Sequence, residues 1–305
     1  LTAADDDHVA WVEPPSGPTG GASTLRRVPI EIGPVLAEGL WPEVTAVLTS
    51  ATVPPSLGER LGLPVADTKV VDVGSPFPYD EAALLYCAAH LPDRRRPESD
   101  AAVHDELAAL ITAAGGRALA LFTSWRAMRG ALDALRPVLP YRLLAQNDLP
   151  KLALLEAFTA DESSCLFATM SFWQGVDVPG ATLSLVAIDR LPFPRPDDPL
   201  LDARRRRAGG RSFLVVDLPR AATLLAQGAG RLIRSSTDAG VVAVLDRRLA
   251  TAGYRRTMLG ALPPMPFTTR RDEALAFLRA RTRAGAVEPA AGGGRSSVVA
   301  DRRRQ

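Results

Sequence analysis

Between residues 100 and 245, short apolar runs alternate with longer segments whose apolar residues recur every three or four positions. The short runs predict buried strands, and the longer segments predict amphipathic helices. We expect strands at residues 118–122, 141–144, 165–168, 183–188 and 241–245, and helices around residues 103–111, 125–135, 149–158, after 199 and around 227–234. Strands that alternate with helices predict an α/β fold, in which a doubly wound parallel sheet carries helices on both sides.

Small and polar residues mark the ends of several of these elements. Gly115 and Gly116 are expected to stop the first helix, because glycine readily takes the left-handed conformation of a helix C-terminus. Ser124 is expected to cap the second helix. Asp198 would cap a third, in which Pro199 is the first residue.

The chain begins and ends differently from its middle. We expect a short strand around residues 9–12, a helical or turn segment up to Trp41, and a buried strand at residues 45–48. A further strand is expected at 69–73, inside a segment interrupted by prolines. The small hydroxyl residues that follow 45–48 suit either a site loop or an ordinary turn.

At the other end, Thr269 and Asp272 form a capping-box pattern for a short helix to about residue 280. Residues 284–305 predict a disordered tail. The arginine run 204–207 reads most simply as a solvated helix face, although it is also suited to a phosphate backbone.

The composition is that of an ordinary soluble globular chain, with a net charge of +2 over 305 residues. Any nucleic-acid surface must therefore be a local patch. Cys87 and Cys165 are too few and too far apart for a zinc ribbon or a four-cysteine iron–sulfur site, and they suit a reducing cytoplasm. No apolar run approaches the length of a membrane span. Because the chain starts at Leu1, we expect a fragment of a longer protein.

The segment QGAGRLIR, residues 227–234, carries the clearest candidate chemistry. In a helix, Gln227, Arg231 and Arg234 would share one face, while Leu232 and Ile233 would be buried. The small residues around Gly230 would let an anion approach the arginines closely. Two guanidinium forks directed at one place suit a polyphosphate better than a lone carboxylate.

Loops after the predicted strands offer further candidates, because ligands of open parallel sheets bind beyond the carboxyl ends of the strands. Gly175 would allow a tight turn beside a sugar phosphate, and Asp177 would accept from a ribose hydroxyl or pair with an arginine. The aromatic side chains Trp125, Phe172 and Trp173 are suited to stacking on bases. A place in the hydrophobic core is an equal alternative for Phe172.

Four segments together resemble the late helicase motifs of the DinG/XPD-like group of superfamily 2 helicases. In chain order they read VLTSATV, ALALFTSW, FATMSFWQGVDVPGATLSLVAIDRLPFPRPDDPL and QGAGRLIRSSTDAGVVAVLDRRL, and the resemblance covers residues 9–266. It implies a RecA-like second motor domain at residues 56–283, preceded by the end of a first motor domain at 1–55.

The resemblance also implies roles for individual residues. A motif that couples nucleotide state to strand binding would contain Thr49, Ser50 and Thr52. A motif that contacts nucleic acid would contain Thr123, Ser124 and Trp125. The interdomain motif would contain Gly175 and Asp177, and the nucleotide-sensing motif, with its arginine fingers, would contain Gln227, Gly230, Arg231 and Arg234.

Several parts of a complete motor are missing from the sequence. Neither of its two lysines, Lys69 and Lys151, follows a glycine, so it has no P-loop. The carboxylate pairs that begin at Asp80, Asp105 and Asp272 lack the preceding apolar strand of a magnesium-binding box. The iron–sulfur cysteines of many relatives are absent as well.

We therefore expect the C-terminal motor half of an ATP-dependent DNA helicase, inactive without the domain that binds ATP and Mg²⁺. The resemblance implies single-stranded or forked DNA as the partner, and we expect a monomer in the cytoplasm without a metal site of its own. The alternatives are a non-catalytic module that binds single strands or a motor partner, and a parent protein that also carries a nuclease domain.

Overall fold

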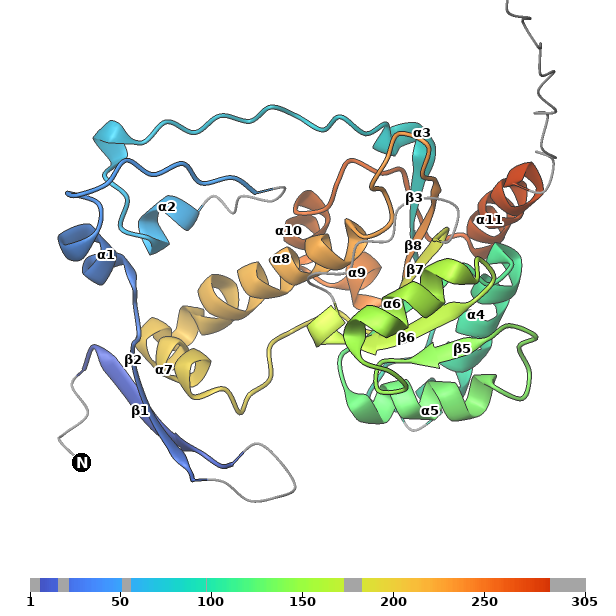
Figure 1. The fold of residues 1–305 in the computed structure, drawn as a ribbon, viewed down its shortest axis with the longest axis horizontal. Helices are drawn as coiled ribbons and strands as arrows, with labels where there is room; N and C mark the ends of the chain where they lie inside the picture. The colour runs from blue at the N-terminus through green and yellow to red at the C-terminus, as the bar shows by residue number, and fades with distance from the viewer. Residues whose placement is uncertain (1–5, 16–21, 51–55, 97, 173–182, 286–305) are drawn as a thin grey trace, which may run out of the picture.

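Seven parallel strands form the centre of the molecule, in the order β5-β6-β4-β7-β8-β3-β9 (Figure 1). The computed structural model describes residues 6–15, 22–50, 56–96, 98–172 and 183–285. The strands are β3 (Ala83–Cys87), β4 (Ala118–Phe122), β5 (Leu143–Ala145), β6 (Cys165–Thr169), β7 (Leu185–Ile188), β8 (Gly240–Val244) and β9 (Phe267–Thr268). The predicted doubly wound α/β fold is confirmed.

Helices cover both faces of this sheet, because successive side chains of a strand point to opposite sides. Leu119, Val186 and Val242 face the layer of α6 (Lys151–Ala160), α8 (Leu218–Ala229) and α10 (Arg255–Gly260). Ala120 and Ala187 face the layer of α4 (Ser99–Ala114), α5 (Trp125–Leu135) and α11 (Arg271–Gly285). Each layer forms its own hydrophobic core with one face of the sheet.

Glycine is required where neighbouring strands begin. A Cβ atom on Gly240 would lie 2.0 Å from the carbonyl oxygen of Ser184, directly before β7. Gly116 has a φ of +81°, and a Cβ atom there would lie 1.8 Å from the carbonyl oxygen of Ser163. These close approaches let the strands start side by side, and no larger residue fits there without a backbone shift.

The N-terminal part forms a smaller body beside the sheet (Figure 1). Strand β1 (His8–Glu13) pairs antiparallel with β2 (Thr24–Pro29), and α1 (Gly33–Gly39) and α2 (Leu57–Arg60) follow. The indole N–H of Trp41 donates to the carbonyl of Leu61 at 2.7 Å, which fixes α2 beside α1. The long helix α8 and the preceding α7 (Pro199–Ala208) connect this body to the sheet.

Short elements complete the described chain. They are α3 (Tyr79–Ala82), α9 (Arg248–Thr251), the 3-10 turns η1 (Val65–Asp67), η2 (Met170–Phe172) and η3 (Gly209–Arg211), and η4 (Phe213–Asp217), which is a π-helix.

Two predicted strands are wrong. Residues 45–48 have no regular structure and are exposed, with Val47 at 85% exposure, because no strand of the described sheets lies beside them. Residues 69–73 are also irregular and exposed, and the buried strand of this region is β3, at Ala83–Cys87. An apolar run becomes a strand only where a neighbour supplies hydrogen bonds and a packing surface.

Helix ends also differ in detail from expectation. The last helix, α11, begins at Arg271 and continues to Gly285. The Thr268 hydroxyl, and not that of Thr269, accepts from the N–H of Arg270 and donates to the Glu273 carboxylate. The predicted tail from residue 286 onward lies outside the described residues.

Candidate functional site

Residues 230–238 form a loop, which we call the arginine turn, and this corrects the prediction of a helix through Arg234. Helix α8 ends at Ala229, with Gly230 as its C-cap residue. The next two N–H groups, of Arg231 and Leu232, donate to carbonyls three residues back, at 3.2 Å each, and so tighten the last turn. Gln227, on α8, therefore does not share one helical face with Arg231 and Arg234.

Asp238 holds the arginine turn in shape. Its carboxylate accepts from the backbone N–H of Arg234 at 2.7 Å, and from the N–H and hydroxyl of Ser235 at 2.8 Å each. Asp238 is only 5% exposed, and Leu232 and Ile233 are buried in the core as predicted. The half-buried Arg231 and Arg234 thus belong to a loop that is anchored from both sides.

The arginine turn lies at the amino edge of the sheet, because it leads into the first residue of β8. Arg234 is close enough to Tyr79, which precedes β3, to influence its acidity. Burial raises the pKa of Tyr79, and the positive charge of Arg234 partly opposes this rise. Figure 1 places the end of α8 and α3 at the same end of the strands.

The predicted strand-contacting residues lie at the opposite edge. Thr123, Ser124 and Trp125 follow the carboxyl end of β4, and the Ser124 Oγ accepts from the N–H of Ala127 at 3.2 Å as the predicted cap of α5. The Ser124 hydroxyl proton is therefore still free to donate to a ligand. Trp125 is 38% exposed, with the guanidinium of Arg129 6.0 Å from its ring centroid.

Other predicted residues are placed less favourably. Phe172 is 4% exposed, and the ammonium of Lys151 lies 5.3 Å from its ring centroid, so the structure favours the core alternative over stacking on bases. Thr49 and Ser50 are exposed in the irregular segment after residue 48. Four predicted site residues lie outside the described residues: Thr52, Trp173, Gly175 and Asp177.

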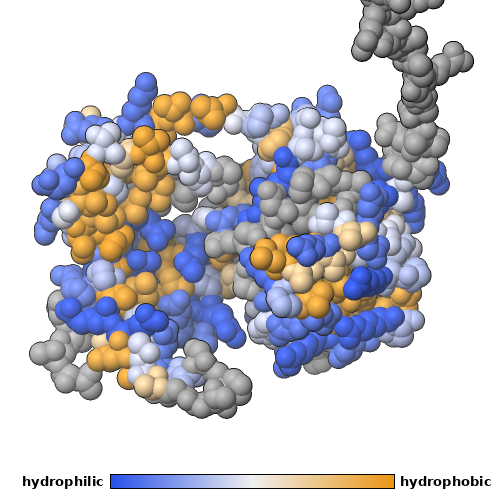
Figure 2. Space-filling view, viewed as in Figure 1, coloured by the Kyte–Doolittle hydropathy of each residue, from blue (hydrophilic) through white to orange (hydrophobic). Residues whose placement is uncertain are grey.

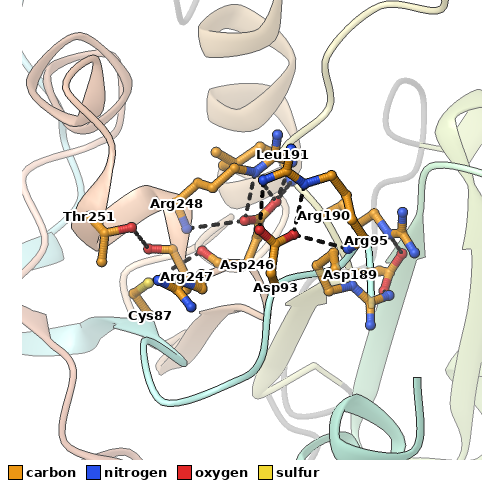
Figure 3. Close-up of polar contacts among 11 residues, drawn as sticks. Cys87, Asp93, Arg95, Asp189, Arg190, Leu191, Asp246, Arg247, Arg248 and Thr251 are labelled. Atoms are coloured by element: carbon orange, nitrogen blue, oxygen red, sulfur yellow. Dashed lines mark hydrogen bonds and ion pairs between the residues drawn. The ribbon is translucent and has the colours of Figure 1, made fainter. Parts of the chain in front are cut away.

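A charged network beyond the carboxyl ends of β7 and β8 was not predicted (Figure 3). Asp246 is buried, accepts from the N–H of Leu191 at 3.1 Å, and forms an ion pair with Arg248 at 2.6 Å. Burial raises the pKa of Asp246, but the bonds from Arg248 and Leu191 outweigh it, so that the pKa lies below its ordinary value.

Asp189 forms the second part of this network. Its carboxylate pairs with Arg94 and lies 3.6 Å from the Nε of Arg190. Burial raises the pKa of Asp189 to about 6, against the opposing charges of the two arginines. Asp189 and Asp246 each follow a buried apolar run directly, and this position is the signal that would have found them.

Within the described ranges, no three or more His, Cys, Asp and Glu side chains gather in a way that would hold a metal ion. None of the helices in those ranges combines the length and the apolarity that a membrane crossing requires.

Comparison with known proteins places most of the chain in one family. Residues 107–265 match the family model described as helicase C-terminal domain. The chain is 47% identical over 293 residues to the ATP-dependent helicase DinG of Mycobacterium tuberculosis, which covers 92% of this chain and 44% of that protein. It is 39% identical over 264 residues to the ATP-dependent DNA helicase YoaA of Escherichia coli, which covers 84% of this chain and 41% of that protein.

The fold agrees with a solved structure. The structure titled XPD_Helicase superposes with a TM-score of 0.61 over 81% of this chain and 46% of that chain, at 18% sequence identity. This likeness concerns the fold alone. The chain spans less than half the length of the relatives that it matches.

Proposed function

The chain belongs to the helicase C-terminal domain family of the DinG/XPD type, and on that premise we propose that it is the second motor half of an ATP-dependent DNA helicase. In the complete protein, ATP would bind between two RecA-like lobes. The lobe in this chain would supply the arginines that contact the terminal phosphate.

The arginine turn carries this proposal. Arg231 and Arg234 lie in a loop that Asp238 fixes by hydrogen bonds and that Leu232 and Ile233 anchor in the core. A guanidinium that is positioned before the reaction stabilises transition-state charge without reorganisation. An arginine finger of this kind contributes roughly 10³ to 10⁵ in rate.

The carboxyl edge of the sheet would hold the nucleic acid. Thr123 and the Ser124 hydroxyl are suited to phosphate oxygens, and the exposed ring of Trp125 is suited to stacking on a base. Single-stranded or forked DNA is the proposed partner. Nucleotide and strand would then occupy opposite edges of the same sheet.

The remaining parts of the motor would come from residues outside this chain. We propose that the P-loop and the carboxylates that bind Mg²⁺ belong to a first motor lobe. Residues 1–55 would form the end of that lobe, and residues 56–283 would form the second lobe. No described cluster of this chain is suited to magnesium. The chain alone is therefore expected to hydrolyse ATP negligibly.

Arg234→Ala, made in the full-length protein, tests the proposal. We expect DNA-stimulated ATP turnover to fall by roughly 10³-fold or more, with ATP binding nearly unchanged. Arg279→Ala is the matched control, because Arg279 is an exposed arginine on α11, outside the turn. An equal loss of ATP binding and turnover in Arg234→Ala would contradict a role in catalysis and indicate a structural one.

A further inference from the structure

A pocket of about 350 Å³ lies between the N-terminal body and the two helices α7 and α8. Its walls come from three parts of the chain that are distant in sequence. They include Arg60 on α2, Arg204 and Arg207 on α7, and Arg220 and Thr223 on α8. Figure 2 shows openings between the N-terminal body and the sheet, bordered by both hydrophilic and apolar side chains. The volume is at the lower end of the range for small-molecule sites, about 300–1,000 Å³.

The lining of this pocket is strongly positive. Four of its described residues are arginines, and one, Glu31, is acidic. Like charges repel one another, so such a group is costly unless an anion joins it. The effect is visible on Arg204. Its pKa is lowered first by burial and then by the charges of Arg60 and Arg220, against the opposing effect of Glu31.

Two of these arginines are held in place. Arg204 is 16% exposed, and its Nε donates to the carbonyl of Ile30 at 2.8 Å, with Glu31 3.7 Å away. Arg207 donates to the Asp7 carboxylate at 2.7 Å. The run 204–207 is therefore not simply a solvated face, because these side chains bridge to the N-terminal body.

The other two arginines are available to a ligand. Arg60 and Arg220 are exposed, and neither side chain forms an ion pair or hydrogen bond with any residue that the structure describes. Anchored guanidiniums beside exposed ones suit a ligand with several negative oxygens, because each planar fork is able to contact two oxygens of a phosphate. A single carboxylate would still leave one of the two remaining positive charges, those of Arg60 and Arg220, uncompensated, because Arg204 and Arg207 already face Glu31 and Asp7.

We propose that this pocket binds consecutive phosphate groups, supplied by the backbone of a nucleic-acid strand or by a free polyphosphate. Neither Arg231 nor Arg234 lines the pocket, whereas Gln227, which precedes the arginine turn on α8, does. An occupant would join Arg60 of the N-terminal body to Arg220 of α8, and would thereby clamp the N-terminal body against the two helices.

The test titrates the purified chain with tripolyphosphate and with a short oligothymidylate, each at low and at high salt. The pocket variant is Arg60→Gln/Arg220→Gln, which removes two exposed charges without disturbing the anchored pair. Arg279→Gln/Arg283→Gln is the control, because it removes two exposed arginines from α11 on the far side of the molecule. Thermal melting confirms that both variants are folded.

We expect the pocket variant to bind at least one probe roughly tenfold more weakly than wild type, and the control to stay within about twofold. For the oligonucleotide, the slope of log affinity against log salt should fall by roughly 1.4, or about 0.7 for each lost phosphate contact. Loss with both probes identifies phosphate groups alone as sufficient. Loss with one probe identifies the strand backbone or the free polyphosphate as the source.

The proposal is overturned if wild type binds neither probe, or if the pocket variant and the control lose affinity equally. These outcomes are independent of the helicase proposal, which rests on Arg234 and is tested by ATP turnover.

Discussion

Replacing Asp238 by alanine should loosen the arginine turn and lower the stability of the whole chain. The change removes an acceptor that serves two backbone N–H groups and one hydroxyl, at 2.7 to 2.8 Å. Hydrogen bonds to a charged group contribute about 1.5–3 kcal/mol each. Because Arg234 and Ser235 are only half-buried, water would satisfy part of what is lost. We therefore expect a loss of about 2–4 kcal/mol in the free energy of unfolding.

Urea unfolding followed by circular dichroism measures this loss. Asp238→Asn is the matched control, since it keeps the shape and one carbonyl acceptor and should cost about 1–2 kcal/mol. Ser235→Ala removes the hydroxyl's bond to Asp238 and its two contacts with the exposed Thr237. It leaves both backbone bonds to Asp238 in place and should cost less than Asp238→Ala. If Asp238→Ala unfolds within about 0.5 kcal/mol of wild type, Asp238 does not hold the turn, and the claim that Arg234 is positioned in advance fails.

Three further predictions concern other parts of the fold. Ser124→Ala should lower the free energy of unfolding, measured in urea, by about 1 kcal/mol through loss of the α5 cap. Ser124→Asp should keep most of the wild-type stability, because aspartate also caps helices. Equal losses in the two variants would exclude a capping role. Glu106→Leu should lower the free energy of unfolding by about 2–3 kcal/mol, because the buried Glu106 accepts from the Tyr86 hydroxyl and from Arg271, both at 2.7 Å. Glu106→Gln should cost less. A Glu106→Leu variant as stable as wild type would contradict this. For Asp189, the folded pKa of about 6 lies above the unfolded value of about 3.9, so the folded state binds the proton more tightly. Stability should then fall as pH rises from about 4 to about 6, and Asp189→Asn, measured by thermal melting across that range, should remove this slope; an unchanged slope would show that another group causes it.

The sequence predicts the middle of the fold well because its signals there are local. Strand β4 begins and ends at the predicted residues, since an apolar run is enclosed by Gly116 before it and by Ser124, the cap of α5, after it. The N-cap at Asp198 is likewise confirmed, with its carboxylate accepting from the N–H of Leu201 at 3.0 Å. In each case a residue and its near neighbours determine the conformation.

Predictions fail where the conformation depends on a distant partner. The apolar residues at 45–48 have the composition of a buried strand, but a strand needs a neighbour, and periodicity carries no information about one. Helical spacing similarly favours continuing α8 through Arg234. The glycines at its end and the hydrogen bonds that Asp238 accepts favour a turn instead. The pairing of Asp189 with Arg94 and of Asp246 with Leu191 was missed because these partners come together only in the folded sheet.

The opposite placement of the arginine turn and Trp125 constrains how one could influence the other. Strand β4 has five residues, which at about 3.3 Å each separates the two edges by roughly 16 Å. No single side chain spans that distance, so a signal between them needs several residues, and the packed core shared by the strands and α8 connects the two edges. The buried alanines between the edges, such as Ala187 and Ala243, would then keep this part of the core closely packed and rigid. In the proposed motor, enlarging or softening the core around them would lower ATP turnover without changing the residues proposed to contact nucleotide or DNA.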